Sequence, residues 1–384
     1  MPGRVCLVGE HSDWAAISDY NKTSGLNATG LALICPTDQG IHISARMSPP
    51  SSITDDAILL QHLDFTYTTT SRQDCLLQFN FHHIVITPIS ELLDKIEPQD
   101  RQFVMYIVGV LKQLFSNQTI MSKIEKTGQS LICHNYNTTL PMGKGVSSSA
   151  AISVLITRIF NTCYQLGLSI EEEINIAFQG ERSIGSECGK LDHGCAYGDV
   201  AVCLSMRFNI DSSVTVEKFI KRKEVAIQEG AKIYMLLIDL NAKKDTIKIL
   251  KDLNKAFTKE NSEVNDDLFQ NARNYLLREN HDICERALQF VEEKNAQALG
   301  QLLSHAQNEF DKNLQPLCPE ELTAPILHSV LNDTLVQTLI FGGKGVGSGG
   351  DGSCIVCCKG FEERELLKNH LESTCNMPCL YLTL

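Results

Sequence analysis

The feature that most constrains this chain is a loop of glycine and serine between a strand-like run and a helical pattern. The run 130–133 is apolar and predicts a strand, the loop 140–147 carries two glycines, and Ala151, Val154 and Ile159 recur with helical spacing. The first amide groups of a helix have no internal partner and lie at the positive end of its dipole. With glycines that admit close approach, they predict an anion site, most simply for phosphate. A capped helix after a tight turn is the alternative interpretation.

A second glycine-rich stretch lies near the C-terminus, where residues 342–352 hold seven glycines in eleven positions. Each glycine loses much conformational freedom on folding, so we expect this loop to approach a ligand or another backbone closely. The runs 335–341 and 355–358 predict flanking strands. The dinucleotide fingerprint occurs letter by letter from Gly345 to Gly350, but that fingerprint must open a helix, and this loop runs into a strand. Neither loop has the spacing of a P-loop.

Two candidate site acids, Glu181 and Asp192, lie beyond the helix that follows the first loop. A second helix is predicted to begin at Ser169, with acidic residues in its first turn, and it carries Glu181. The chain then turns, and Asp192 lies in that turn between Gly189 and Gly194. Asp192 is either a cap or a catalytic carboxylate, and this segment alone leaves both open.

A cluster of polar side chains follows the first predicted strand. Residues 4–8 form a short apolar run, and Glu10, His11 and Asp13 come directly after it. A polar loop after a buried strand is a common place for a site, and a solvated turn is the alternative. The two runs that follow predict a hairpin that turns at residues 38–40.

Length and composition narrow the class of protein. A chain of 384 residues predicts two domains, which we place at 1–220 and 221–384. The formal charge of −12 argues against nucleic acid or an anionic membrane as the main partner, but not against a nucleotide substrate. Fifteen irregularly spaced cysteines, without a secretory or membrane-spanning run, predict free thiols in the cytoplasm. A lone Cys-x-x-Cys at Cys354 and Cys357 indicates a buried strand more than a zinc site.

Several segments together resemble the GHMP small-molecule kinases and, within them, the galactokinase-like sugar kinases. The stretch from Pro2 to Trp14 resembles the motif PGRVN…GEHTDYN, and residues 141–151 resemble PxGxGLxSSAA. Residues 344–353 resemble the family's C-terminal glycine-rich motif, and residues 188–193 resemble CGxMDQ. Two departures stand out: Trp14 replaces a tyrosine, and the third motif contains an aspartate.

The resemblance implies an α+β fold of two domains, with a ribosomal protein S5 domain 2-like N-terminal domain, a ferredoxin-like C-terminal domain and an active site between them. It implies ATP and Mg²⁺ as cofactors and a monomer or homodimer that acts on a small sugar. By this resemblance, the ATP-binding residues are Pro141, Gly143, Lys144, Gly145, Val146, Ser147, Ser148, Ser149 and Ala150. The implied substrate-binding residues are Glu10, His11, Asp13, Gly189, Asp192, Gly347 and Gly349. Ser149 and Glu181 are the implied Mg²⁺ ligands, and Arg4 and Asp192 the implied catalytic pair.

The chemistry expected of these residues is phosphoryl transfer. Asp192 orients the acceptor hydroxyl or takes its proton, and Arg4 keeps Asp192 ionised. The polar first motif favours a polyol, and hence the anomeric hydroxyl of a monosaccharide. A mevalonate-type kinase and a catalytically silent sugar-sensing regulator are the alternatives.

Overall fold

The structure, a computed structural model, describes residues 1–26, 28–48, 64–69, 75–80, 87–94, 98–141, 145–186, 188–197, 202–209, 218–226, 232–258, 261 and 266–384. The chain separates into two units that are interleaved in sequence. Unit 1 comprises Met1–Gly3, Gln39–Gly143 and Ser147–Tyr197. Unit 2 comprises Arg4–Asp38, Lys144–Val146 and Gly198–Leu384. The predicted domain boundary at residue 220 stays a prediction.

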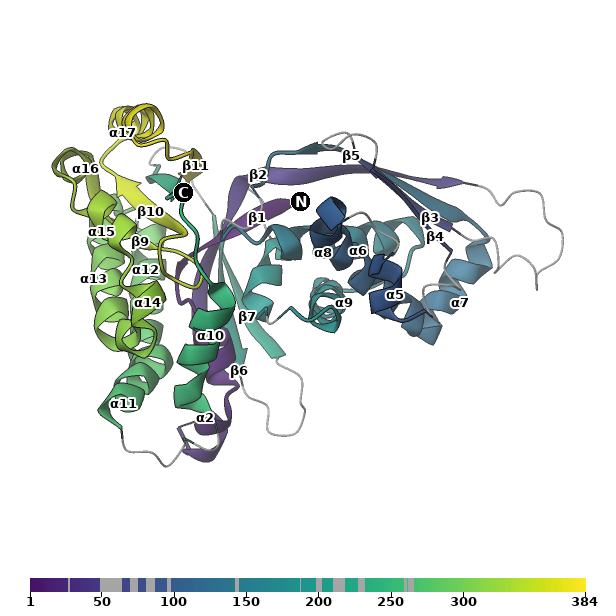
Figure 1. Ribbon diagram of the computed structural model, residues 1–384, viewed down its shortest axis with the longest axis horizontal. Helices are drawn as coiled ribbons and strands as arrows, with labels where there is room; N and C mark the ends of the chain where they lie inside the picture. The colour runs from purple at the N-terminus through teal and green to yellow at the C-terminus, as the bar shows by residue number, and fades with distance from the viewer. Residues whose placement is uncertain are drawn as a thin grey trace. The chain divides into compact units, whose positions relative to one another are not determined.

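Unit 1 is a sheet with helices along one of its faces (Figure 1). Its strands follow the order β4-β3-β5-β2, in which β3 and β5 are parallel and the other pairs antiparallel. Phe65 of the sheet and Phe160 of the helical layer are fully buried, with ring centroids 5.7 Å apart. The elements are the C-terminal part of β2 (Gly30–Ser48), β3 (Asp64–Thr69), β4 (Cys75–Asn80), α5 (Ile89–Asp94), α6 (Pro98–Ser116), α7 (Gln118–Thr127), β5 (Ser130–Thr138), α8 (Ser148–Cys163), α9 (Ile170–Ser183) and the 3₁₀ helix η2 (Lys190–Tyr197).

Helices α8 and α9 of unit 1 begin where the sequence predicts. Helix α9 starts with a capping box, in which the Ser169 hydroxyl accepts from the amide of Glu172 and the Glu172 carboxylate accepts from the amide of Ser169. Helices α6 and α9 pack closely because Gly109 faces Gly180, and a Cβ built at Gly109 would lie 2.3 Å from the Gly180 carbonyl oxygen. The predicted strand–loop–helix order is confirmed by β5 and α8.

The hairpin predicted at residues 38–40 is wrong, because β2 runs through those residues as one continuous strand. Gly40 lies there for another reason. A Cβ at Gly40 would lie 2.7 Å from the carbonyl oxygen of Met1, and the amide of Ile41 donates to that oxygen at 2.8 Å. The glycine therefore admits a neighbouring backbone, and no turn forms.

Unit 2 contains a four-stranded antiparallel sheet of order β11-β8-β10-β9. The N-terminal part of β2 also pairs with β6, and β6 with β7. The strands of unit 2 are β1 (Pro2–Val8) from Arg4 onward, β6 (Val202–Asn209), β7 (Lys218–Ala226), β8 (Tyr234–Asp239), β9 (Ile340–Gly345), β10 (Ser353–Cys358) and β11 (Cys379–Thr383). Its helices are α1 (Ser12–Ala16), α2 (Asp19–Thr23), α10 (Thr246–Asn254), η3 (Lys255–Phe257), α11 (Asp267–Asn274), η4 (Tyr275–Glu279), α12 (Asn280–Glu292), α13 (Ala296–Leu314), η5 (Gln315–Leu317), α14 (Pro319–Leu322), α15 (Pro325–Leu331), α16 (Thr334–Leu339) and α17 (Phe361–Thr374).

Part of the C-terminal glycine-rich stretch serves packing. Helix α13 lies against β9, and a Cβ at Gly342 would lie 2.1 Å from the carbonyl oxygen of Gly300 on that helix (Figure 1). Asp351, the unexpected acid of the third motif, accepts a hydrogen bond from the amide of Leu327 at 2.8 Å and so holds the start of α15. The strand predicted over 335–341 is wrong over residues 335–339, because Asp333 caps the helix α16 there, and only its last two residues belong to β9.

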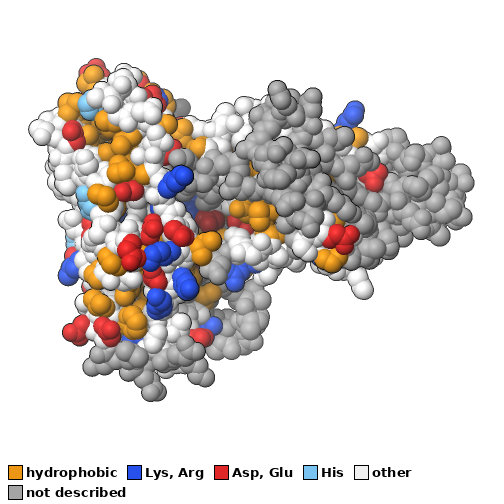
Figure 2. All heavy atoms as spheres, viewed as in Figure 1, with side chains coloured by type: hydrophobic (Ala, Val, Ile, Leu, Met, Phe, Trp, Pro, Cys, Tyr) orange, Lys and Arg blue, Asp and Glu red, His pale blue; other side chains and the backbone are white. Residues whose placement is uncertain are grey.

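The Cys-x-x-Cys belongs to a fully buried strand, as expected. All six residues of β10 are buried, and burial raises the pKa of the Cys354 and Cys357 thiols, that of Cys357 to about 12. Among the helices described here, none is both long and apolar enough to span a bilayer. On the face of unit 2 shown in Figure 2, basic side chains lie among acidic ones. Lys255, for example, pairs with Asp252 at 2.7 Å.

Candidate functional site

The start of α8 brings a carboxylate to the glycine–serine loop. Ser147 is the N-cap and has a left-handed backbone with φ of 57°, which costs a non-glycine residue of order 1–3 kcal/mol. Its hydroxyl donates a 2.9 Å hydrogen bond to Oδ1 of Asp192. Ser148 and Ser149 form the first turn, and Ala150 is buried beneath them. The strained cap thus joins the predicted phosphate-binding turn to the predicted catalytic acid.

The structure describes only some of the other residues predicted in these loops. Gly143 and Lys144, predicted to contact ATP, lie outside the described residues. Pro141 and Gly189 are half-buried beside the described ends of their loops. In unit 2, the amide of Arg4 donates to the carbonyl of Val146 at 3.1 Å, so β1 holds that end of the loop. The Arg4 side chain is buried. Its pairing with Asp192 stays a prediction.

Glu181 and His193 form a buried acid–imidazole pair in unit 1. Their side chains are 2% and 0% exposed, and His193 Nε2 lies 3.1 Å from Glu181 Oε2 without the alignment of a hydrogen bond. The Ser186 hydroxyl donates to Oε1 of Glu181 at 3.4 Å. Burial raises the pKa of this carboxyl, but His193 and the hydroxyls of Ser149 and Ser186 outweigh burial, and the net pKa is lowered. Glu181 is therefore an ionised carboxylate beside Ser149, as a pair of metal ligands requires.

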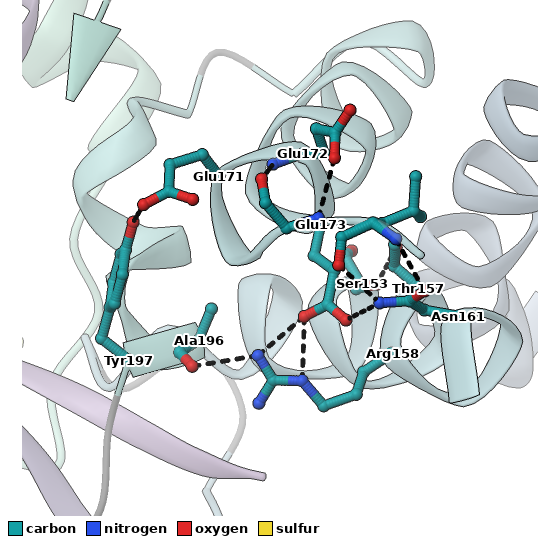
Figure 3. A network of polar contacts seen from close by, with 11 residues as sticks. Ser153, Thr157, Arg158, Asn161, Glu171, Glu172, Glu173, Ala196 and Tyr197 are labelled. Carbon is teal, nitrogen blue, oxygen red and sulfur yellow. Dashed lines mark hydrogen bonds and ion pairs between the residues drawn. The ribbon is translucent and has the colours of Figure 1, made fainter. Parts of the chain in front are cut away.

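A network of polar contacts fixes the segment that carries Asp192 and His193 (Figure 3). Arg158 of α8 donates to Oε2 of Glu173 on α9 through two nitrogens, at 2.9 and 2.7 Å, and also to the carbonyl of Ala196 in η2 at 3.0 Å. Tyr197 donates from the other side to Glu171 at 2.9 Å. Because one guanidinium joins both helices to η2, the acids of the site are held on rigid elements.

The first motif forms a second polar cluster, in unit 2. Contrary to the loop expected there, residues 12–16 form the short helix α1, and the predicted residues Glu10, His11 and Asp13 are buried. Lys344 Nζ lies 2.5 Å from Oε1 of Glu10 and also donates to the carbonyl of Gly345 at 2.7 Å. Glu10 is thus already paired with a lysine of the third motif.

His11 is a neutral imidazole. Trp14 Nε1 donates to its Nδ1 at 3.1 Å, so the proton is assigned to Nε2. Burial lowers the pKa of His11 to about 4; the Ser348 backbone opposes this shift, and the charges of Lys244 and Lys344 add to it. Trp14, which stands where the motif that the sequence resembles has tyrosine, therefore orients this histidine.

The two glycine-rich loops meet within unit 2. A Cβ built at Gly347, whose φ is 70°, would lie 3.8 Å from the Cα of Gly145. Gly349 has φ of 86°, and a Cβ there would lie 2.7 Å from the Phe310 ring. Both positions require glycine, and they bring predicted nucleotide- and substrate-binding residues side by side.

Lys244 is a residue of this loop region that sequence reasoning missed. Its Nζ donates to the carbonyl of Gly349 at 2.9 Å, and a Cβ at Gly352 would meet its side chain at 2.7 Å. Burial lowers the pKa of Lys244 to about 8, against the raising effect of Glu10 and Glu321. The lysine pair 243–244 after a buried strand was the available signal. His193 and Lys344 were also missed as site residues. His193 follows Asp192 directly, and Lys344 is the first residue of the third motif.

Comparisons with known proteins bear on the family and the fold. The family model described as GHMP kinases N terminal domain matches residues 106–204. Galactokinase of Clostridium perfringens (strain 13 / Type A) is 25% identical over 388 residues, covering 96% of this chain and 87% of that protein. Galactokinase of Actinobacillus pleuropneumoniae serotype 3 is 23% identical over 384 residues, covering 96% and 86%.

Solved structures share the fold along the chain. Lactococcus lactis galactokinase complexed with galactose gives a TM-score of 0.63 at 14% identity and covers 100% of this chain and 91% of that one. Methanococcus jannaschii mevalonate kinase gives 0.63 at 16% identity and covers 99% and 95%. These similarities confirm the predicted two-domain α+β fold and support a small-molecule kinase. The chain is thus similar to the GHMP kinases N terminal domain at residues 106–204, and its fold is similar to those of a galactokinase and a mevalonate kinase.

Proposed function

We propose that this protein transfers the γ-phosphoryl group of ATP to a hydroxyl of a small molecule, and that the acceptor is the anomeric hydroxyl of a monosaccharide. The observation that carries the proposal is the hydrogen bond between Ser147 at the cap of α8 and Asp192. It joins an acid to a helix N-terminus suited to phosphate. An acid and a phosphate-binding turn on one rigid frame are the main parts that phosphoryl transfer requires.

The proposed reaction forms one bond and breaks one. The acceptor oxygen bonds to the γ-phosphorus, the bond from that phosphorus to the β–γ bridging oxygen breaks, and ADP leaves with the electron pair. Asp192 orients the acceptor hydroxyl and takes its proton. The backbone of residues 145–149 positions the phosphates, and Lys244 adds positive charge at the neighbouring glycine-rich loop.

Mg²⁺ fits residues that the structure describes. Ser149 and Glu181 offer the hard oxygen donors that Mg²⁺ prefers, and Glu181 Oε2 is buried without a hydrogen-bond partner. When bound, the ion would neutralise charge on the phosphates. Ser149 and Glu181 would hold the ion. The ion pair of Arg158 with Glu173 would keep the helices that carry these two residues in place.

The choice of a sugar as acceptor rests on the sequence relatives and on the polar first motif. Both sequence relatives reported above are galactokinases, whereas the structural neighbours include a mevalonate kinase at the same TM-score. His11 and Asp13 favour hydroxyl groups, but Glu10 is engaged by Lys344. We therefore propose a sugar, and leave its identity to experiment.

The test is ADP release by the purified chain with ATP, Mg²⁺ and a panel of acceptors: galactose, other hexoses, pentoses, uronic acids, deoxy sugars and mevalonate. We expect turnover with at least one sugar. Turnover with mevalonate alone would replace the sugar by that acid. Saturable sugar binding without ADP release would instead indicate a regulator, and no turnover or binding with any acceptor would overturn the proposal.

A further inference from the structure

Beside the proposed phosphate site lies a cluster of three different metal-ligating side chains. Glu181 of α9, Cys188 of the following turn and His193 of η2 each offer one ligand atom, and these atoms all lie within 4.8 Å of one another. Glu181 and His193 are buried, and Cys188 is half-buried. The half-buried thiol gives the cluster a route to solvent.

Polar atoms in this cluster lack hydrogen bonds. Glu181 Oε2 and both ring nitrogens of His193 are buried and have no hydrogen-bond partner among the described residues. A buried polar atom left in this way has given up its hydrogen bonds to water without replacing them. Phe178 packs edge-on against the imidazole, with ring centroids 5.7 Å apart, and holds it in place. His193 Nε2 and Glu181 Oε2 are only 3.1 Å apart, so one bound ion could contact both atoms. Such contacts would replace the hydrogen bonds that these atoms lack.

The donor set selects the class of ion. A carboxylate oxygen, a thiolate sulfur and an imidazole nitrogen suit Zn²⁺, whereas Mg²⁺ and Ca²⁺ take oxygen ligands. Tetrahedral Zn²⁺ keeps its ligand atoms about 3.3–3.8 Å apart, so no separation in the cluster, all being within 4.8 Å, would need to close by more than about 1–1.5 Å. The carboxylate and thiolate together balance the charge of a divalent ion.

We propose that Glu181, Cys188 and His193 form a three-ligand site for Zn²⁺ or a divalent ion of similar softness, with a fourth position open. The site is independent of the proposed kinase activity, since it needs neither ATP nor acceptor. It shares Glu181 with the proposed Mg²⁺ position, so the two ions exclude each other there.

A Co²⁺ titration of the full chain, stripped of metal and free of nucleotide, tests the site. Co²⁺ serves in place of colourless Zn²⁺ because a thiolate ligand gives it a charge-transfer absorption. We expect that absorption to saturate at one equivalent and to disappear when Zn²⁺ is added. Cys188→Ser should abolish it, and His193→Gln should weaken it. The control Cys375→Ser, at an exposed thiol outside the cluster, should leave it unchanged.

Zn²⁺ affinity, measured by competition with a chromophoric chelator, gives the second readout. We expect either cluster variant to raise the apparent Kd at least about tenfold. Absence of the absorption in the unaltered protein, or its persistence in Cys188→Ser, would overturn the proposal. Equal Zn²⁺ affinity in all variants would place the ion on other thiols and overturn it equally. Should buried His193→Gln fail to fold, Cys188→Ser at the half-buried position decides alone.

Discussion

The two units each bury a glutamate beside a basic side chain, and the two pairs differ in how fully they are satisfied. In unit 2, Glu10 meets Lys344 at 2.5 Å, and Lys344 donates in addition to a backbone carbonyl. In unit 1, Glu181 approaches His193 at 3.1 Å, yet Oε2 and both ring nitrogens have no hydrogen bond within the described chain. The first pair is complete as folded, whereas the second has capacity for a ligand. Burial of an acid therefore does not by itself mark a binding site; its unfilled hydrogen-bonding capacity does.

Removal of Lys344 should have the largest effect on stability. Lys344→Met leaves the Glu10 carboxylate buried without its cation, which costs about 3–5 kcal/mol. The measurement is urea unfolding of the full chain. The double variant Glu10→Gln with Lys344→Met should recover most of the loss, because no buried charge remains.

A matched control is available at an exposed pair. Lys255 contacts Asp252 at 2.7 Å with its side chain 56% exposed, and Lys255→Met should change stability little. If Lys344→Met were as mild as this control, the Glu10 pair would not be the structural unit inferred here.

Loss of the acid at the α8 cap should have the largest effect on turnover. Asp192→Asn keeps the shape and can still meet Ser147, but it cannot take a proton. We expect kcat to fall at least about a hundredfold, with only a modest change in ATP binding. Steady-state kinetics and equilibrium binding of ATP measure the two effects separately. Near-normal turnover would remove Asp192 from the chemistry.

The pH dependence of activity should report Lys244. Its pKa of about 8 means that the ammonium is charged below that pH and neutral above it. If the charge supports anion binding at the glycine-rich loop, kcat/KM for ATP should fall about tenfold per pH unit above pH 8. Lys244→Arg should remove that inflection, whereas Lys243→Arg at the exposed neighbour should keep it. An unchanged inflection in Lys244→Arg would assign it to another group.

The same lowered pKa has a consequence for stability. The folded chain binds this proton less tightly than the unfolded chain, whose lysine has the usual pKa of 10.5. The unfolded state therefore holds more protons between pH 8 and 10.5, and the contribution of Lys244 to the free energy of unfolding rises with pH in that window. Below pH 8 its penalty is present in full. Unfolding measured across this range should show the rise in the unaltered chain and lose it in Lys244→Met.

The sequence predicted best what short-range chemistry determines. The capping box at Ser169, the strand before the glycine–serine loop and the helix after it all follow from local spacing, and the structure has them. Turn signals misled where a glycine serves close approach, as Gly40 does against the carbonyl of Met1. No local pattern distinguishes a glycine that turns the chain from one that admits a neighbouring strand.

The missed parts of the candidate site are contacts between distant residues. Lys344 and Glu10 are 334 positions apart, and Lys244 reaches Gly349 across 105 positions. From the sequence, each lysine is expected to lie at the surface, because its neighbours in the chain do not indicate that it is partly or fully buried. The motifs drew attention to these segments, but they did not reveal that Glu10, one of the predicted sugar-binding acids, is already paired.

The smallest effect should come from the hydroxyl that joins the loop to the acid. Ser147→Ala removes the 2.9 Å hydrogen bond to Asp192 but keeps the carboxylate, and one such bond contributes about 0.5–1.5 kcal/mol. We therefore expect kcat to fall roughly threefold to tenfold, with KM for ATP nearly unchanged, because the serine positions the acid. Ser147→Asn, which tolerates the left-handed backbone and still carries a donor, should keep most of the rate if the hydrogen bond is what matters. A loss as large as that of Asp192→Asn would instead place Ser147 in direct contact with the reacting groups.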